Sequence, residues 1–196
     1  MKIDRLSRNI LFAFTVCMSS VGVAQAAECK YAENSVDKFT KATVVITEWE
    51  QLTHWMREVR REMTGYVSAS SYDGEKYLRI KIEYVRDLAT SAKQDAPGSA
   101  ISVPEGGELM IAMSDGAVLK LPASKAVDGH TVSDDPHPDW LTTIAAIDYE
   151  LDASTADALT TQSAKAVRVM TDSGHYDVKI HKRNADDIKK AIECVQ

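Results

Sequence analysis

The stretch Gly65–Val85, "GYVSASSYDGEKYLRIKIEYV", indicates which kind of fold this chain adopts. Apolar and polar residues alternate on both sides of Asp73-Gly74, and a period of two is typical of a strand with one buried face. An Asp-Gly pair between two such runs is the strongest short-range signal of a hairpin. The stretch therefore predicts two antiparallel strands joined by a tight turn.

Two later stretches repeat this pattern. "GELMIAMSDGAVLKL" turns at Asp115-Gly116, and "KAVRVMTDSGHYDVKI" turns at Asp172–Gly174. Calcium-binding loops are the alternative explanation for the repeated Asp-Gly punctuation. Such a loop needs several oxygen ligands at fixed spacing, whereas each of these turns supplies one Asp. We therefore interpret all three turns as corners of a sheet.

The remaining segments complete an α+β pattern. Ala42–Trp49 and Leu141–Leu151 have strand character. Residues 50–63 carry apolar side chains at helical spacing and favour a helix or turn, with an irregular strand as the alternative. We expect an antiparallel β-sheet of hairpins, arranged as a meander, with a few short helices.

Two helices are expected near the end of the chain. Ser154 and Asp157 have the spacing of a capping box, which predicts a short helix beginning at this point. Asn184 can cap the last helix. That helix has an apolar stripe, by which we expect it to dock on the sheet: Ile188, Ala191, Ile192 and Val195.

A resemblance follows from the order of "VDKFTKATVVITEWEQL", "YDGEKYLRIKI", "GELMIAMSDGAVLKL" and "IDYELDASTADALTTQSAKAVRVMTDSGHYDVKI". This order resembles a loose group of small exported bacterial proteins with repeated strand-DG-strand hairpins, whose function is uncharacterised. The resemblance covers most of residues 36–195. It implies hairpins, a short helical step and a C-terminal helix, and it supplies no catalytic residues.

The first residues predict export. A basic start precedes the apolar run Ile10–Ala24, and Ala24-Gln25-Ala26 fits the pattern that a signal peptidase cleaves. We predict a signal peptide over residues 1–26, cleaved after Ala26, and one globular domain over 27–196 in the periplasm or outside the cell. An uncleaved anchor is the alternative, but a membrane span needs about 20 apolar residues. Lipid attachment at Cys17 is disfavoured because Val16 precedes it.

Two cysteines remain after cleavage, Cys29 and Cys194. An exported chain with an even number of cysteines usually forms disulfides, so we predict a Cys29–Cys194 bridge that ties the two ends together. The alternative is a reactive or metal-binding thiol pair, and no C-x-x-C motif supports it. The net charge of −6, without a basic block, argues against nucleic acid and against anionic membranes as partners.

The densest polar cluster is "DGHTVSDDPHPDW", the loop Asp128–Asp139 with Trp140 after it. Imidazole and carboxylate groups are ligands for zinc and similar ions. The candidate ligands of a divalent metal are His130, Asp134, Asp135, His137 and Asp139. The alternative is a solvated acidic loop in which Asp and Pro form turns. No other cofactor is predicted.

No nucleophile motif such as G-x-S-x-G is present, so the sequence identifies no catalytic residue. Exposed aromatic residues could form a ligand or partner surface, and core packing is the alternative. Tyr72 and Trp140 are the candidates chosen from a larger set: Trp49, Trp55, Trp140, Tyr66, Tyr72, Tyr77 and Tyr84. The leading hypothesis is an exported, non-enzymatic binding module, inhibitor- or immunity-like, with a protein partner in the cell envelope. The second is a metal-binding protein or metal-dependent hydrolase that uses the Asp128–Asp139 loop. The third is a structural envelope protein.

Overall fold

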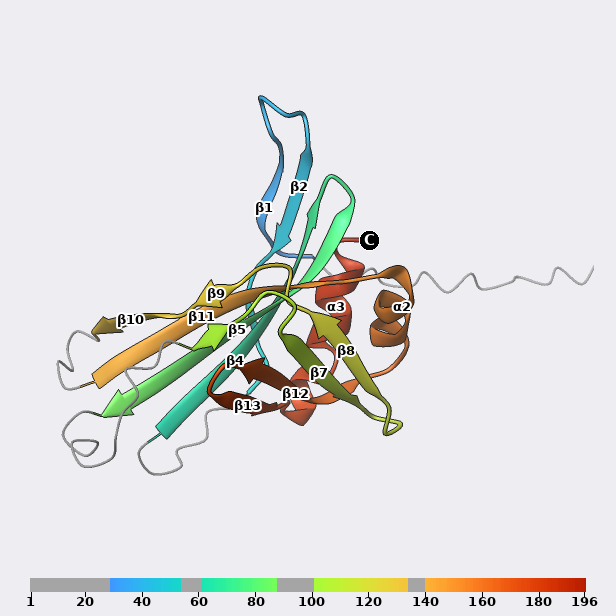
Figure 1. Cartoon of the computed structure of the whole chain (residues 1–196). Helices are drawn as coiled ribbons and strands as arrows, with labels where there is room; N and C mark the ends of the chain where they lie inside the picture. Colours follow the sequence, from blue (N-terminus) through green and yellow to red (C-terminus); the bar gives the residue numbers. More distant parts are fainter. Residues whose placement is uncertain (1–28, 54–60, 88–100, 134–139) are drawn as a thin grey trace, which may run out of the picture.

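The computed structural model describes residues 29–53, 61–87, 101–133 and 140–196 (Figure 1). Most of them lie in strands. The strands are β1 (Tyr31–Val36), β2 (Thr43–Thr47), β3 (Glu50–Gln51), β4 (Arg61–Tyr72), β5 (Glu75–Asp87), β6 (Ser102–Val103), β7 (Glu108–Met113), β8 (Val118–Pro122), β9 (Val127–Asp128), β10 (His130–Ser133), β11 (Trp140–Glu150), β12 (Ala164–Thr171) and β13 (Gly174–Lys179). The helices are α2 (Ala153–Thr161), the 3₁₀ turn η1 (Lys182–Asn184) and α3 (Asp187–Glu193).

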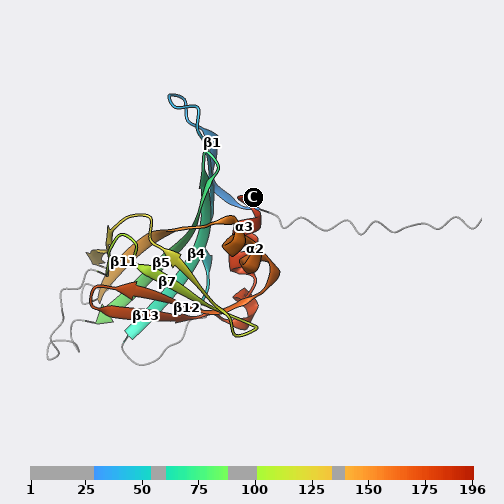
Figure 2. The same cartoon turned by 45° about the vertical axis from the view of Figure 1, so that its right-hand side comes forward.

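The strands form two larger antiparallel sheets and one small ribbon. The first sheet has the order β1-β2-β4-β5-β11-β10, and β3 also pairs with β4. The second has the order β13-β12-β7-β8, and β6 pairs with β9. The second sheet lies against the long strands β4, β5 and β11, and both helices lie at one end of these strands (Figures 1 and 2).

The three predicted hairpins are confirmed: β4 pairs with β5, β7 with β8, and β12 with β13. The glycine of each turn has a positive φ, at +89° for Gly74, +96° for Gly116 and +137° for Gly174. Only glycine adopts such angles without strain, and a Cβ at these positions would meet nothing within 4 Å. Backbone conformation, not lack of space, therefore explains the three glycines.

The sequence predicts that the three hairpins form one sheet, and the structure places them in two. β12 pairs with β7, with Val167 opposite Ile111, so the second and third hairpins form a sheet of their own. The reason is that a turn specifies the pairing of its two flanking strands, whereas the pairing between hairpins depends on which apolar faces bury one another.

The prediction of a helix or turn over residues 50–63 is wrong at both ends of this segment. Glu50–Gln51 form β3, and β4 begins at Arg61; residues 54–60 lie outside the described part. β4 pairs with β5 as far as its first residue, and Met63 lies opposite Tyr84. Pairing with the long neighbouring strand therefore overrides the helical spacing of the apolar residues.

Both helices are present, but their predicted caps are wrong. The N-cap of α2 is Asp152, whose Oδ1 accepts a hydrogen bond of 2.7 Å from the Thr155 amide. A carboxylate two residues earlier thus takes the role predicted for Ser154. Asp186 is the N-cap residue of α3, and Asn184 instead donates from Nδ2 to the carbonyl of Gln51.

The core lies between the inner faces of the two larger sheets. Buried aliphatic residues of both sheets contribute to it: Leu78, Ile80, Ile82 and Ile147 from one sheet, and Leu109, Ile111, Val167 and Val169 from the other. Each such side chain stabilises the fold by about 1.5–3 kcal/mol. Gly65 lets the sheets approach closely, because a Cβ there would lie 2.5 Å from Val178 Cγ1.

The Cys29–Cys194 disulfide is present, with the two Cα atoms 5.7 Å apart. It joins the start of β1 to the end of α3, and Tyr31 Oη donates to the carbonyl of Cys194 at 3.3 Å. Ala191 forms a small buried cluster with Ala69 of β4. Within the described residues, no helix is long and apolar enough to cross a membrane.

β1 and β2 form an arm that projects from the body (Figures 1 and 2). All six residues of β1 are exposed, and Phe39 at the turn is 94% exposed. Asp37 orders this turn, because its Oδ1 accepts hydrogen bonds from the amides of Phe39 at 2.9 Å and Thr40 at 2.6 Å. The arm is therefore an ordered hairpin that contributes little to the core.

Candidate binding surface

The outer face of the first sheet, which points away from the core, carries polar and aromatic side chains. Val67 and Ile80 are opposite one another and buried in the core. Since side chains alternate along a strand, the next residues point outward: Tyr66 lies opposite Lys81, and Ser68 lies opposite Arg79. The strand pairing therefore brings aromatic and basic residues together on one surface.

Trp49, between β2 and β3, completes this arrangement. The Cζ atom of Arg79 lies 4.9 Å from the centroid of the Trp49 ring, and Lys81 Nζ lies 5.5 Å from it. Lys81 Nζ also lies 4.1 Å from the Tyr66 ring centroid. A cation over an aromatic face is attracted by the ring quadrupole, by about 0.5–1 kcal/mol at exposed sites. We name these four residues the aromatic-cation face.

Two carboxylates hold the cations in place. Arg79 Nε lies 2.9 Å from Asp148 Oδ1, with both side chains less than one-fifth exposed. Lys81 Nζ lies 2.8 Å from Glu83 Oε1. Tyr66 Oη donates to Glu83 Oε2 at 3.0 Å. Partial burial, this hydrogen bond and the charge of Glu83 raise the pKa of Tyr66 to about 12, so the phenol stays protonated to a higher pH than an exposed tyrosine.

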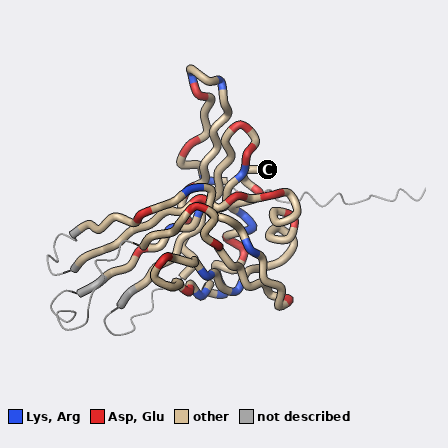
Figure 3. Tube along the Cα trace, viewed as in Figure 1, with Lys and Arg blue, Asp and Glu red and all other residues tan. Residues whose placement is uncertain are grey.

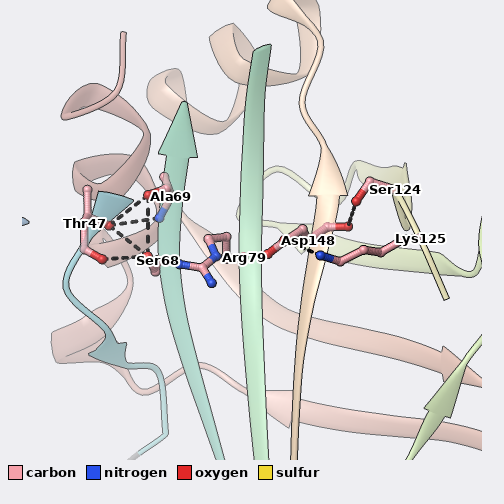
Figure 4. A network of polar contacts seen from close by, with 7 residues as sticks. All are labelled: Thr47, Ser68, Ala69, Arg79, Ser124, Lys125 and Asp148. Carbon is pink, nitrogen blue, oxygen red and sulfur yellow. Dashed lines mark hydrogen bonds and ion pairs between the residues drawn. The ribbon is translucent and has the colours of Figure 1, made fainter. Parts of the chain in front are cut away.

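Polar contacts on both sides of Arg79 extend the ordered surface from β2 to the segment after β8 (Figure 4). Thr47 Oγ1 accepts from the Ala69 amide at 2.9 Å and thereby substitutes for a ladder bond, while Ser68 Oγ donates to the Thr47 carbonyl at 2.8 Å. Beyond Asp148, Ser124 Oγ donates to the Asp148 carbonyl at 3.1 Å. These bonds tie neighbouring strands together, so the surface is fixed before any ligand arrives.

Tyr72, one of the two aromatic residues predicted for a partner surface, lies at the end of β4. It is 37% exposed, and its ring centroid is 6.0 Å from that of Tyr77. By the alternation of β4 it points to the same side as Tyr66. Trp140 begins β11, but its side chain lies outside the described part. Whether either residue contacts a partner stays a prediction.

The sequence does not single out Arg79 and Lys81. Their spacing in "YLRIKIEY" is the available signal, because residues two apart share one face of a strand. Trp49 is distant in sequence and reaches them only because β2 and β3 both pair with β4. The prediction of an aromatic surface thus includes Trp49, Tyr66 and Tyr72 of this region, but it does not name the two cations that lie against these rings.

The candidate metal ligands are described only in part. His130 is exposed on β10, and Asp128 is exposed on β9, where its Oδ1 accepts from Ser102 Oγ at 2.8 Å. The other candidates lie outside the described residues: Asp134, Asp135, His137 and Asp139. Within the described ranges, no group of three or more His, Cys, Asp or Glu residues could hold a metal ion. The metal site stays a prediction.

Comparison with known proteins adds no relative. No protein-family model matches the chain, no curated protein matches it, and no solved structure matches its fold. The resemblance to small exported bacterial proteins therefore stays a prediction, and function is argued from the surface itself.

Proposed function

We propose that this chain is an exported, non-enzymatic binding module whose aromatic-cation face contacts a protein partner in the bacterial cell envelope. The observation that carries the proposal is the interleaving of Trp49 and Tyr66 with Arg79 and Lys81 on one sheet face. Trp, Tyr and Arg are the residues most enriched among those that dominate binding energy at protein interfaces.

The ordering of these side chains supports the same proposal. Binding costs about 0.5–1.5 kcal/mol for each flexible side chain that must be immobilised. Arg79 is already held by Asp148 and Lys81 by Glu83, so much of this ordering is done in the free protein. A face of this kind suits a folded partner of complementary shape, and inhibitor- or immunity-like proteins bind partners of this kind.

Export is part of the proposal and has its own support. The Cys29–Cys194 bridge is the kind of covalent link that persists in oxidising compartments. The N-terminal sequence has the pattern of a cleaved signal peptide.

Affinity capture with matched variants tests the proposal. The chain 27–196 is immobilised and incubated with envelope extract, in parallel with Lys81→Glu and Tyr66→Ala variants. Lys38→Glu is the control, because it makes the same charge change on the exposed arm. We expect one protein to bind the unchanged chain and the control, and to be lost from both face variants.

Thermal unfolding of each variant separates lost binding from lost folding. A captured protein that binds both face variants as well as the unchanged chain would show that the aromatic-cation face is not the contact surface. A folded chain that converts a substrate without a partner would refute the non-enzymatic role.

A further inference from the structure

The outer face of the second sheet contains a separate apolar hollow. Its floor is formed by Met110, Ala112, Val118 and Ala166, and the hollow has a volume of about 530 Å³. These side chains are neighbours because Arg168 lies opposite Met110 and Ala166 lies opposite Ala112. Val118 is 53% exposed. The floor is therefore accessible and belongs to neither the core nor the aromatic-cation face.

Basic residues surround this floor. Lys165, Arg168 and Lys179 line the hollow, with Asp177 as the acidic residue among its lining. Asp177 is engaged by Arg168 in a two-pronged ion pair of 2.6 and 2.7 Å, which lowers the pKa of the Asp177 carboxyl. One carboxylate therefore balances one of three cations.

Among the described residues neither lysine forms a salt bridge, although the pKa of the Asp115 carboxyl is lowered by a hydrogen bond from the Ala117 amide and, to a smaller extent, by the charge of Lys165. Lys165 Nζ donates to the carbonyl of Ser114 at 2.8 Å, and a carbonyl carries no net charge. The side chain of Lys179 forms no ion pair or hydrogen bond in the part of the chain that the structure describes. The lining of the hollow therefore carries three cations and one carboxylate, on a chain whose net charge is −6. Figure 3 shows basic positions, with acidic ones between them, along the strands of the second sheet.

We propose that this hollow docks an acidic and apolar segment of a protein, in which one or two large apolar side chains are flanked by carboxylates. The apolar residues would cover Met110 and Val118, and the carboxylates would pair with Lys165 and Lys179. The volume is in the range of pockets that hold a few side chains. Complementary charge at the rim adds orientation and a faster association rate. Because the hollow lies on the other outer face, the chain could join two partners.

A defined peptide tests this inference by chemical-shift titration of the isotopically labelled chain 27–196. The probe has a leucine-phenylalanine pair flanked on each side by two glutamates, and the matched control peptide has lysines instead of glutamates. We expect saturable shifts of the amides of β7, β8 and β12 with the acidic peptide alone. Raised salt should weaken binding, because the rim lysines are exposed.

Variants locate the binding. Lys179→Glu should weaken binding of the acidic peptide at least about fivefold, since two like charges replace an attractive pair. Val118→Ser should also weaken peptide binding. Lys38→Glu should leave peptide binding unchanged. Tyr66→Ala should leave it unchanged as well, so that the aromatic-cation face and the hollow succeed or fail separately. Equal binding of both peptides, or binding that survives Lys179→Glu, would overturn the inference.

Vesicles of phosphatidylethanolamine and phosphatidylglycerol provide the last comparison. A lipid surface has negative charge and apolar groups, as the peptide does, but it contains no polypeptide segment that could enter the hollow. Binding to these vesicles without binding to the acidic peptide would assign the hollow to membranes and overturn the protein-segment proposal. Binding to neither probe would also overturn it.

Discussion

Removing the Cys29–Cys194 bridge tests whether the ends of the chain stabilise the whole fold. The two cysteines are 165 residues apart, so the bridge closes nearly all of the described chain into one loop. The chain-entropy relation for a loop of this length gives about 5 kcal/mol at room temperature. Small domains are stable by about 5–15 kcal/mol in total, so the loss should be large but need not abolish folding.

The perturbation is the double variant Cys29→Ser/Cys194→Ser of the chain 27–196, which lacks Cys17 and so has no free thiol. Urea unfolding, followed by tryptophan fluorescence, gives the free energy of unfolding of both chains. We expect a loss of about 3–5 kcal/mol, because strain and residual structure usually reduce the entropic value. Chemical reduction of the unchanged chain is the control and should give a similar loss. A loss below about 1 kcal/mol would refute the reasoning, since the bridge would then not constrain the unfolded chain.

Four further predictions concern single positions or pairs. Tyr149→Phe should leave stability unchanged or raise it by about 1 kcal/mol in urea unfolding, because the buried hydroxyl has no hydrogen-bond partner among the described residues; a clear loss would contradict this. Gly65→Ala should destabilise by about 1–3 kcal/mol, because the new Cβ meets the facing sheet; an unchanged midpoint would argue against the close approach. Stability should fall as pH rises from 10 to about 12, because unfolding frees the Tyr66 phenol to ionise at its ordinary pKa of 10.0; Tyr66→Phe should remove that part of the fall in alkaline unfolding curves. If the segment Asp128–Asp139 binds a metal, purified protein should contain one ion per chain that His130→Ala/His137→Ala loses; metal-free protein would refute the site.

The hairpins could be predicted because each is encoded locally. At Asp73-Gly74 both central residues have positive φ, as a tight hairpin turn requires, and the flanking alternation defines which face is buried. The disulfide could be predicted because cleavage of the predicted signal peptide leaves two of the three cysteines, and two cysteines have one possible pairing. The pairing of β12 with β7 could not, because it depends on packing between segments that are more than fifty residues apart.

The candidate surface illustrates the same limit. Tyr72 is a candidate by its residue type alone, and its contact with a partner stays a prediction. Trp49 could not be placed over Arg79, because their contact requires β2 to pair with β4 and the chain to turn into β3 at the right place. Likewise, Ser154 has the right spacing for a capping box, but Asp152 accepts the amide hydrogen of Thr155. Which of two nearby side chains caps a helix depends on the three-dimensional positions of their oxygen atoms, and the spacing of residues in the sequence does not determine these positions.

The most direct test of the account is the affinity of one captured partner for three versions of the chain. Isothermal titration measures the dissociation constants of the unchanged chain, of Lys81→Glu and of the control Lys38→Glu. The account predicts that Lys81→Glu binds at least about tenfold more weakly, a difference of about 1.4 kcal/mol, while the control binds as tightly as the unchanged chain. Equal dissociation constants for all three chains would contradict the assignment of the aromatic-cation face as the binding surface.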